Sequence, residues 1–168
     1  MRSTTTLMIA ASLLALGACA KKPPKELPPA PVDTTGPVTP PTTGAGILPG
    51  SQEDFVATVS SDRIFFDTDS SDVDGPDQAT LQSQAAWLGK YADKRITIEG
   101  HCDERGTREY NLALGERRAN ATKNALVALG VSTARITTVS YGKERPDAVG
   151  SDEEAYAKNR RAVTVTVQ

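Results

Sequence analysis

The sequence predicts an α/β (α+β) fold for residues 51–168, a single domain in which helices pack on a layered sheet. Two observations predict this class: strand-like and helix-like segments alternate along this stretch, and the series begins and ends with a strand. The chain has 168 residues, of which 38% are hydrophobic, enough for one modest core. A formal net charge of -2 offers no general attraction for phosphate backbones, so no nucleic acid partner is expected.

Four segments have the composition or the alternation of strands. One carries three consecutive large apolar side chains bounded by polar residues, and others alternate apolar and polar side chains as half-buried strands do. The predicted strands span residues 63–66, 95–100, 136–141 and 162–168.

Three segments have helical spacing or helix-start signals. Residues 78–92 place apolar side chains three or four positions apart, which indicates one buried stripe. A longer helix is expected over residues 110–129, because Gly130 provides a C-terminal stop. Ser151 and Glu154 have capping-box spacing at the head of a short helix that ends near residue 160.

The N-terminus has the pattern of a lipoprotein export signal. Arg2 precedes a largely apolar run over residues 7–16, which is too short for a membrane-spanning helix of about 20 residues. The small residues before Cys19 resemble the lipobox of bacterial lipoproteins. This implies removal of residues 1–18 and a membrane anchor of covalent lipid on Cys19, with Ala20 favouring the outer membrane. An ordinary secretory signal with an incidental cysteine is the alternative.

Residues 19–50 are predicted to form a disordered tether. Nine of the eleven prolines lie in this stretch, with threonine and glycine between them and almost no large apolar side chain. Such a segment spans about 30 Å as a coil and about 95 Å when extended, so the domain could work well away from its anchor.

Five separated motifs follow one another in the C-terminal part. They are Phe65-Phe66-Asp67 and the segments at residues 99–107, 110–121, 140–144 and 159–162. Together with the lipobox, the set resembles the lipid-anchored members of the OmpA-like C-terminal domain family, over essentially all of residues 55–168. The resemblance implies a mixed four-stranded sheet with helices packed on it. It also implies a Gram-negative outer-membrane lipoprotein that binds peptidoglycan non-covalently and works with the Tol system in envelope integrity and cell division.

Asp103 and Arg118 are the residues whose chemistry indicates a ligand. Helical spacing places Arg118 on an apolar stripe, where its guanidinium needs a neighbouring Asp or Glu or a ligand carboxylate. Asp103 lies between a predicted strand and this helix, so the two side chains would face a common cleft and fit a zwitterion. The alternative is that both only pair with each other or with neighbours and hold the loop in place.

The family resemblance supplies the ligand and the remaining site residues. It implies that these two side chains contact the free end of meso-diaminopimelate in the peptidoglycan stem peptide, with support from nearby side chains and backbone. The predicted binding residues are Phe66, Asp67, Asp103, Asn111, Leu114 and Arg118. Contact with the β-propeller protein of the Tol system is implied near the same cleft. The predicted partner surface consists of Glu104, Arg105, Arg108 and Glu109.

Other chemistry receives less support from the sequence. Cys102 beside His101 raises the alternative of a cysteine-dependent wall hydrolase, but adjacency in sequence does not make a catalytic pair, and His101 is expected to be a hydrogen-bonded structural residue. The acidic run at residues 67–77 lacks the end ligands of an EF-hand. We therefore expect no enzyme, no metal and no cofactor besides the lipid. A family member that binds murein without a Tol role remains an alternative.

Overall fold

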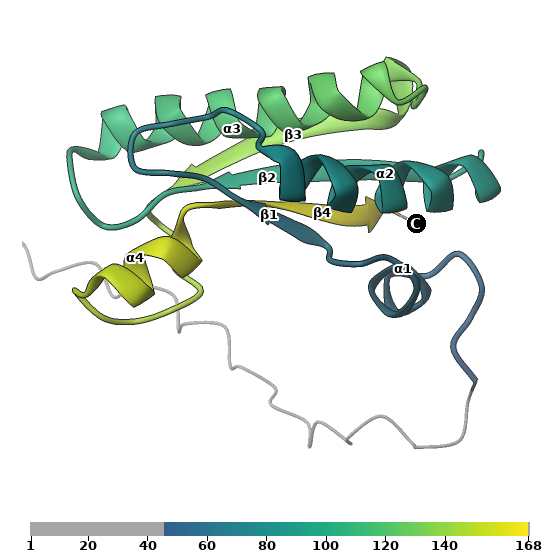
Figure 1. Ribbon diagram of the computed structural model, residues 1–168, viewed down its shortest axis with the longest axis horizontal. Coiled ribbons are helices and arrows are strands. Elements are labelled where there is room, and N and C mark those ends of the chain that lie inside the picture. Colours follow the sequence, from purple (N-terminus) through teal and green to yellow (C-terminus); the bar gives the residue numbers. More distant parts are fainter. Residues whose placement is uncertain (1–45, 168) are drawn as a thin grey trace, which may run out of the picture. The chain divides into compact units, whose positions relative to one another are not determined.

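Four strands form one sheet in the order β1-β4-β2-β3 in the computed structural model, which describes residues 46–167 (Figure 1). The strands are β1 (Arg63–Phe65), β2 (Arg95–His101), β3 (Ile136–Gly142) and β4 (Arg161–Val167). β2 and β3 are parallel, whereas β4 runs antiparallel to both β1 and β2. The mixed four-stranded sheet confirms the predicted fold class. The predicted signal peptide, Cys19 and residues 19–45 of the predicted tether lie outside the described residues.

Helices connect the strands and cover the sheet. The two long helices, α2 and α3, lie side by side on the same face of the sheet, while α4 lies at the end where β2 leads into α3 (Figure 1). The helical elements are α1 (Gln52–Thr58), α2 (Gly75–Lys90), α3 (Arg108–Ala128), the 3₁₀ turn η1 (Thr133–Arg135) and α4 (Glu153–Asn159).

Side-chain caps set the helix starts, and they correct three predicted boundaries. Asp74 accepts a hydrogen bond from the Asp77 N–H at 2.8 Å, so α2 begins three residues before the predicted start and ends at Lys90. Thr107 caps α3 in the same way, so this helix begins at Arg108, two residues before its predicted start. At α4 the cap is Asp152, so the predicted capping role of Ser151 is wrong.

The first helix, α1, was not predicted. Its N-terminus is a reciprocal cap: Ser51 Oγ accepts from the Asp54 N–H at 3.1 Å, and Asp54 Oδ2 accepts from the Gly50 N–H at 2.9 Å. Phe55 anchors the helix through an edge-on contact with Trp87, with ring centroids 5.0 Å apart. The cap signal is present in the sequence, but it directly follows the proline-rich stretch and precedes only seven helical residues.

Two glycines let α3 lie directly on the sheet. A Cβ atom on Gly100 would overlap the Gly115 carbonyl, and a Cβ on Gly115 would overlap the Ser140 hydroxyl. This close approach fixes the height of α3 over β2 and, with it, the position of Arg118 one turn further along the helix. The apolar core between the helices and the sheet includes Phe55, Ile64, Leu81, Trp87, Leu88, Ile96, Ile98 and Leu126.

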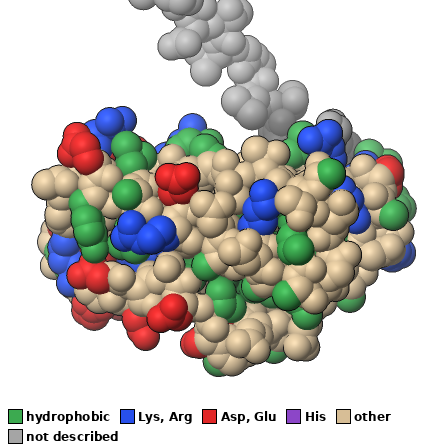
Figure 2. Space-filling model, turned by 90° about the horizontal axis from the view of Figure 1, so that it is seen from above, with side chains coloured by type: hydrophobic (Ala, Val, Ile, Leu, Met, Phe, Trp, Pro, Cys, Tyr) green, Lys and Arg blue, Asp and Glu red, His purple; other side chains and the backbone are tan. Residues whose placement is uncertain are grey.

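One face of the domain illustrates how its surface charges are distributed. On the face shown in Figure 2, lysine and arginine side chains are interspersed with aspartate and glutamate and do not gather into one cationic patch. Among residues 46–167, no helix combines the length and the hydropathy needed to cross a bilayer.

Candidate functional site

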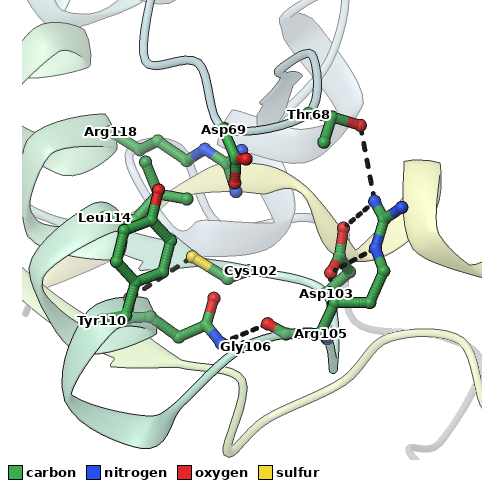
Figure 3. Close-up of a pocket in the computed structure, with 10 residues that line it drawn as sticks. Thr68, Asp69, Cys102, Asp103, Arg105, Gly106, Tyr110, Leu114 and Arg118 are labelled. Carbon is green, nitrogen blue, oxygen red and sulfur yellow. Dashed lines mark hydrogen bonds and ion pairs between the residues drawn. The ribbon is translucent and has the colours of Figure 1, made fainter.

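A cavity of about 260 Å³ opens where β2 ends and α3 begins, under the loop that joins β1 to α2. It lies at the end of the domain opposite to the point where the described chain begins (Figure 1). The β2–β3 register shifts between Gly100 and His101, and the strand then leads Cys102 and Asp103 into the cavity wall. The lining residues are Thr68, Asp69, Cys102, Asp103, Arg105, Gly106, Tyr110, Asn111, Leu114 and Arg118 (Figure 3).

Arg118 reaches the cavity from α3 and is only 1% exposed. Its Nε donates to the Ser70 carbonyl at 2.8 Å, its Nη1 to the His101 carbonyl at 2.9 Å and its Nη2 to the Asp67 carbonyl at 3.0 Å. These partners are neutral carbonyls, not the neighbouring Asp or Glu that the sequence allowed. Because a guanidinium has five N–H donors, one N–H remains on each terminal nitrogen. Burial lowers the pKa of Arg118 from its ordinary value, and the group keeps its positive charge.

Asp103 lies across the cavity from Arg118 and is 7% exposed (Figure 3). Its Oδ1 accepts from the backbone N–H and the Nε of Arg105, both at 3.1 Å, and its Oδ2 accepts from Arg105 Nη2 at 2.7 Å. The Nη1 of Arg160 is 3.6 Å from the same Oδ2. Burial alone would raise the pKa of Asp103, but the hydrogen bonds from Arg105 hold it below the ordinary value. The carboxylate is therefore ionised and already paired.

The predicted binding residues fall into two groups in the structure. Asp103, Asn111, Leu114 and Arg118 line the cavity together. Asn111 orders the rim, because its side-chain amide donates to the carbonyls of Arg105 at 2.7 Å and Thr107 at 3.1 Å.

Phe66 and Asp67 line a neighbouring hollow of about 320 Å³ instead. Both residues still contact Arg118. The Asp67 carbonyl accepts a hydrogen bond from Arg118, and the centre of the Phe66 ring lies 5.2 Å from the Arg118 guanidinium. The Asp67 backbone and the Phe66 ring therefore support Arg118 from the neighbouring hollow.

Sequence reasoning did not assign several residues of this region to the site. Arg160 contacts Asp103. The unassigned residues of the cavity lining are Thr68, Asp69, Cys102, Gly106 and Tyr110. Asp69 adopts a positive φ of 56°, which a sequence does not reveal at a non-glycine position. Arg160 belongs to one of the family motifs, but its contact with Asp103 joins residues far apart in the sequence and depends on the fold.

The predicted partner surface is exposed, but most of its side chains form hydrogen bonds or ion pairs within the domain. Glu104 accepts from the hydroxyls of Ser151 at 2.6 Å and Tyr156 at 3.0 Å, and Arg108 pairs with Glu144 at 3.3 Å. Arg105 forms an ion pair with Asp103. The strip thus presents an ordered charge pattern, not a set of freely solvated side chains.

Cys102 has the properties of a structural thiol. Its side chain is buried, and its Sγ donates to the Asn111 carbonyl at 3.3 Å. Burial raises the pKa of the thiol, which disfavours the thiolate that a nucleophile needs.

His101 is buried, but the expectation that it is hydrogen-bonded was wrong. Among residues 46–167, neither ring nitrogen has a hydrogen-bond partner, although Nε2 is 3.4 Å from a carboxylate oxygen of Glu99. The ring packs against Tyr141 at a centroid distance of 5.5 Å. Burial, together with the positive charge of Arg161, lowers the pKa of His101 to about 4.

Acidification is therefore expected to destabilise the domain through His101. The unfolded chain takes up this proton below about pH 6.5, while the folded state resists it down to about pH 4. Stability should fall across this window by up to about 3 kcal/mol and lose nothing more from this residue at lower pH. Urea unfolding of the wild type and His101→Gln between pH 7 and 4 measures the difference. His101 is the single histidine of the chain, so parallel pH profiles would contradict the assignment.

Comparisons with known proteins agree with this architecture. Residues 65–160 match the OmpA family. The chain is 61% identical over 123 residues to the peptidoglycan-associated lipoprotein of Rhizobium meliloti, covering 73% of this chain and 69% of that protein. It is 49% identical over 117 residues to the protein of the same name in Pseudomonas aeruginosa, covering 70% of this chain and 69% of the relative.

Solved structures give the same result. The crystal structure of the peptidoglycan-associated lipoprotein from Burkholderia pseudomallei is 44% identical, with a TM-score of 0.63, and the match covers 70% of this chain and 98% of the other. The C-terminal domain of Helicobacter pylori MotB, at 21% identity and a TM-score of 0.59 over 64% of this chain and 84% of that one, shares the fold. The length of the family match and the identity to these relatives establish that the chain belongs to the OmpA family.

Proposed function

We propose that the cavity binds peptidoglycan through the free ammonium and carboxylate of meso-diaminopimelate in the stem peptide. The observation that carries the proposal is the Arg118 guanidinium, a buried cation that lines the cavity. In the described part of the chain, its hydrogen-bond partners are three backbone carbonyls and include no carboxylate. Its two remaining N–H groups suit a ligand carboxylate. Asp103 across the cavity supplies an acceptor for the ammonium. The name shared by the relatives, peptidoglycan-associated lipoprotein, supports the same ligand.

A single site of this kind is weak, and the envelope would make it effective. Two charge-assisted contacts of about 1.5 to 3 kcal/mol each, less the cost of ordering, give dissociation constants of about millimolar to tens of micromolar. The wall repeats its stem peptides, and a lipid on Cys19 would confine the domain beside them. The high effective concentration would convert weak binding into a persistent link between outer membrane and wall.

The proposed activity is binding and tethering, without catalysis. A hydrolase would need an activated nucleophile in the cavity, whereas the Cys102 thiol is buried and its pKa is raised. The exposed residues Glu104, Arg105, Arg108 and Glu109 are proposed to contact the Tol β-propeller protein beside the cleft. Because Arg105 also lines the cavity, wall and propeller would compete. A pull-down of the propeller protein separates this role from that of a wall-binding lipoprotein without a Tol partner.

Replacing Asp103 with asparagine is expected to weaken wall binding about 10-fold to 100-fold, because the ammonium loses one charge-assisted contact. The measurement is co-sedimentation of the unlipidated chain with purified murein. Glu116→Gln is the matched control, since it removes one exposed negative charge from α3 outside the cavity lining. Retention of Asp103→Asn at the wild-type level, with cooperative unfolding in both variants, would rule out the proposed ligand contact.

A further inference from the structure

Arg105 occupies the carboxylate that the proposed ligand needs. Its Nε and Nη2 contact the two oxygens of Asp103 at 3.1 and 2.7 Å, which is a bidentate ion pair. An ammonium entering the cavity therefore meets an acceptor whose best positions are taken and whose charge is neutralised. Arg160 adds a second positive charge 3.6 Å from the same carboxylate.

The two arginines differ in their freedom to move. The Arg160 side chain is 8% exposed and is held by the Phe66 carbonyl at 3.0 Å and by Glu153 at 2.8 Å. The Arg105 side chain is 42% exposed and belongs to the loop between β2 and α3. Arg160 is thus a fixed part of the wall, and Arg105 is the arginine that can leave.

A second set of partners for Arg105 is already in place on α4. Its guanidinium centre lies 4.4 Å from the centre of the Tyr156 ring, and its Nη1 lies 3.9 Å from an Oε of Glu153. Both contacts are made by side chains of α4, and the weak contact of Nη2 with Thr68 at 3.4 Å would be given up. If Arg105 left Asp103, its guanidinium would still have partners, because it keeps the aromatic face of Tyr156 and the carboxylate of Glu153.

We propose that Arg105 is a displaceable occupant of Asp103, which a ligand ammonium replaces while Arg105 shifts toward Glu153 and Tyr156. The inference rests on the proposed function and adds a determinant of ligand selection to it. A carboxylate-only ligand can bind Arg118 and leave the Arg105–Asp103 pair closed. Only a ligand that carries a cation at the right distance opens the pair.

Displacement lowers the apparent affinity, because the site must open before the ammonium binds. The apparent dissociation constant equals the intrinsic one divided by the open fraction. Because a partly exposed ion pair of this kind is weak, removing Arg105 should raise the affinity only about threefold to tenfold. The gain should be confined to ligands with a free ammonium.

Calorimetric titration tests the proposal with two ligands. The first is a stem tripeptide that ends in meso-diaminopimelate and has a blocked N-terminus. The second is the same peptide with the free ammonium of its diaminopimelate acetylated. Arg105→Gln should bind the free-ammonium peptide about threefold to tenfold more tightly than the wild type and the acetylated peptide equally well. Arg117→Gln, which removes an exposed arginine of α3 outside the cavity lining, should match the wild type with both peptides.

The outcomes distinguish a failure of Arg105 displacement from a failure of ligand binding itself. Equal or weaker binding of the free-ammonium peptide by Arg105→Gln overturns displacement and leaves the proposed function intact. Absence of binding by the wild type overturns both. The Arg105 Nε–H resonance of the wild type gives a test without substitution. It should shift on titration with the free-ammonium peptide and not with the acetylated one, and an unchanged resonance at saturation would also overturn displacement.

Discussion

A single added methyl group at Gly115 is expected to destabilise the domain by about 3 kcal/mol or more. The new Cβ would overlap the Ser140 hydroxyl and press on the Gly100 carbonyl at 2.9 Å. Ser140 cannot easily yield, because its Oγ donates to the Leu112 carbonyl at 2.7 Å and accepts from the Gly142 N–H at 3.2 Å. Relief therefore requires α3 to lift off the sheet, which opens the core around it.

Urea unfolding measures this effect, and the chain offers a matched control. Gly89 lies in α2 and is exposed, and within residues 46–167 no atom beyond its own turn of helix comes within 4 Å of the position that a Cβ would occupy. Alanine there should stabilise the domain by about 0.5 to 1 kcal/mol, since alanine favours the helix over glycine. Glycine to alanine should thus lower the free energy of unfolding at Gly115 and raise it at Gly89. If alanine at Gly115 lowered the free energy of unfolding by less than about 1 kcal/mol, the helix would adapt to the added methyl group at little cost, and the prediction would be wrong.

The strands and the order of the long helices could be predicted because each element carries its own local pattern. Alternating side chains gave β2 and β4 to within one residue of the observed ends, and Gly130 ends α3 as expected, with a φ of 96°. The missed starts of α2 and α3 share one cause: capping residues and the first helical turn are polar and look like loop. Only the cap geometry separates the two.

The site could be predicted as a list of residues but not as a set of contacts. Asp103 and Arg118 carry unusual chemistry for their expected positions, and both line the cavity. The acceptors of Arg118 are backbone carbonyls, two of them from a loop about fifty residues earlier, and any residue type could supply them. The pairing of Asp103 with Arg105 depends on rotamers in an irregular loop, which leave no periodic signal.

Arg118 should therefore be as important to the fold as to the ligand, and its substitution is expected to have two separable effects. Arg118→Ala removes the buried guanidinium with its three hydrogen bonds and leaves the His101 carbonyl without this donor, which should cost about 3 to 5 kcal/mol of unfolding free energy. Arg118→Lys keeps the charge, but one ammonium cannot replace all three hydrogen bonds to the carbonyls and also offer two donors to the proposed ligand carboxylate. It should retain part of the stability and little of the wall binding.

Comparing the two variants decides whether binding depends on charge or on the shape of the guanidinium. Co-sedimentation with murein is measured at a temperature where urea curves show every variant folded, and Arg117→Ala, exposed on the same helix, should stay within about 0.5 kcal/mol of the wild type. If Arg118→Lys bound murein as well as the wild type, a point charge would suffice and the bidentate contact would be wrong. If Arg118→Ala unfolded at the wild-type urea concentration, the loop at residues 67–70 would not depend on this side chain. Loss of binding in a folded Arg118→Lys variant would show that the two unused N–H groups carry the recognition.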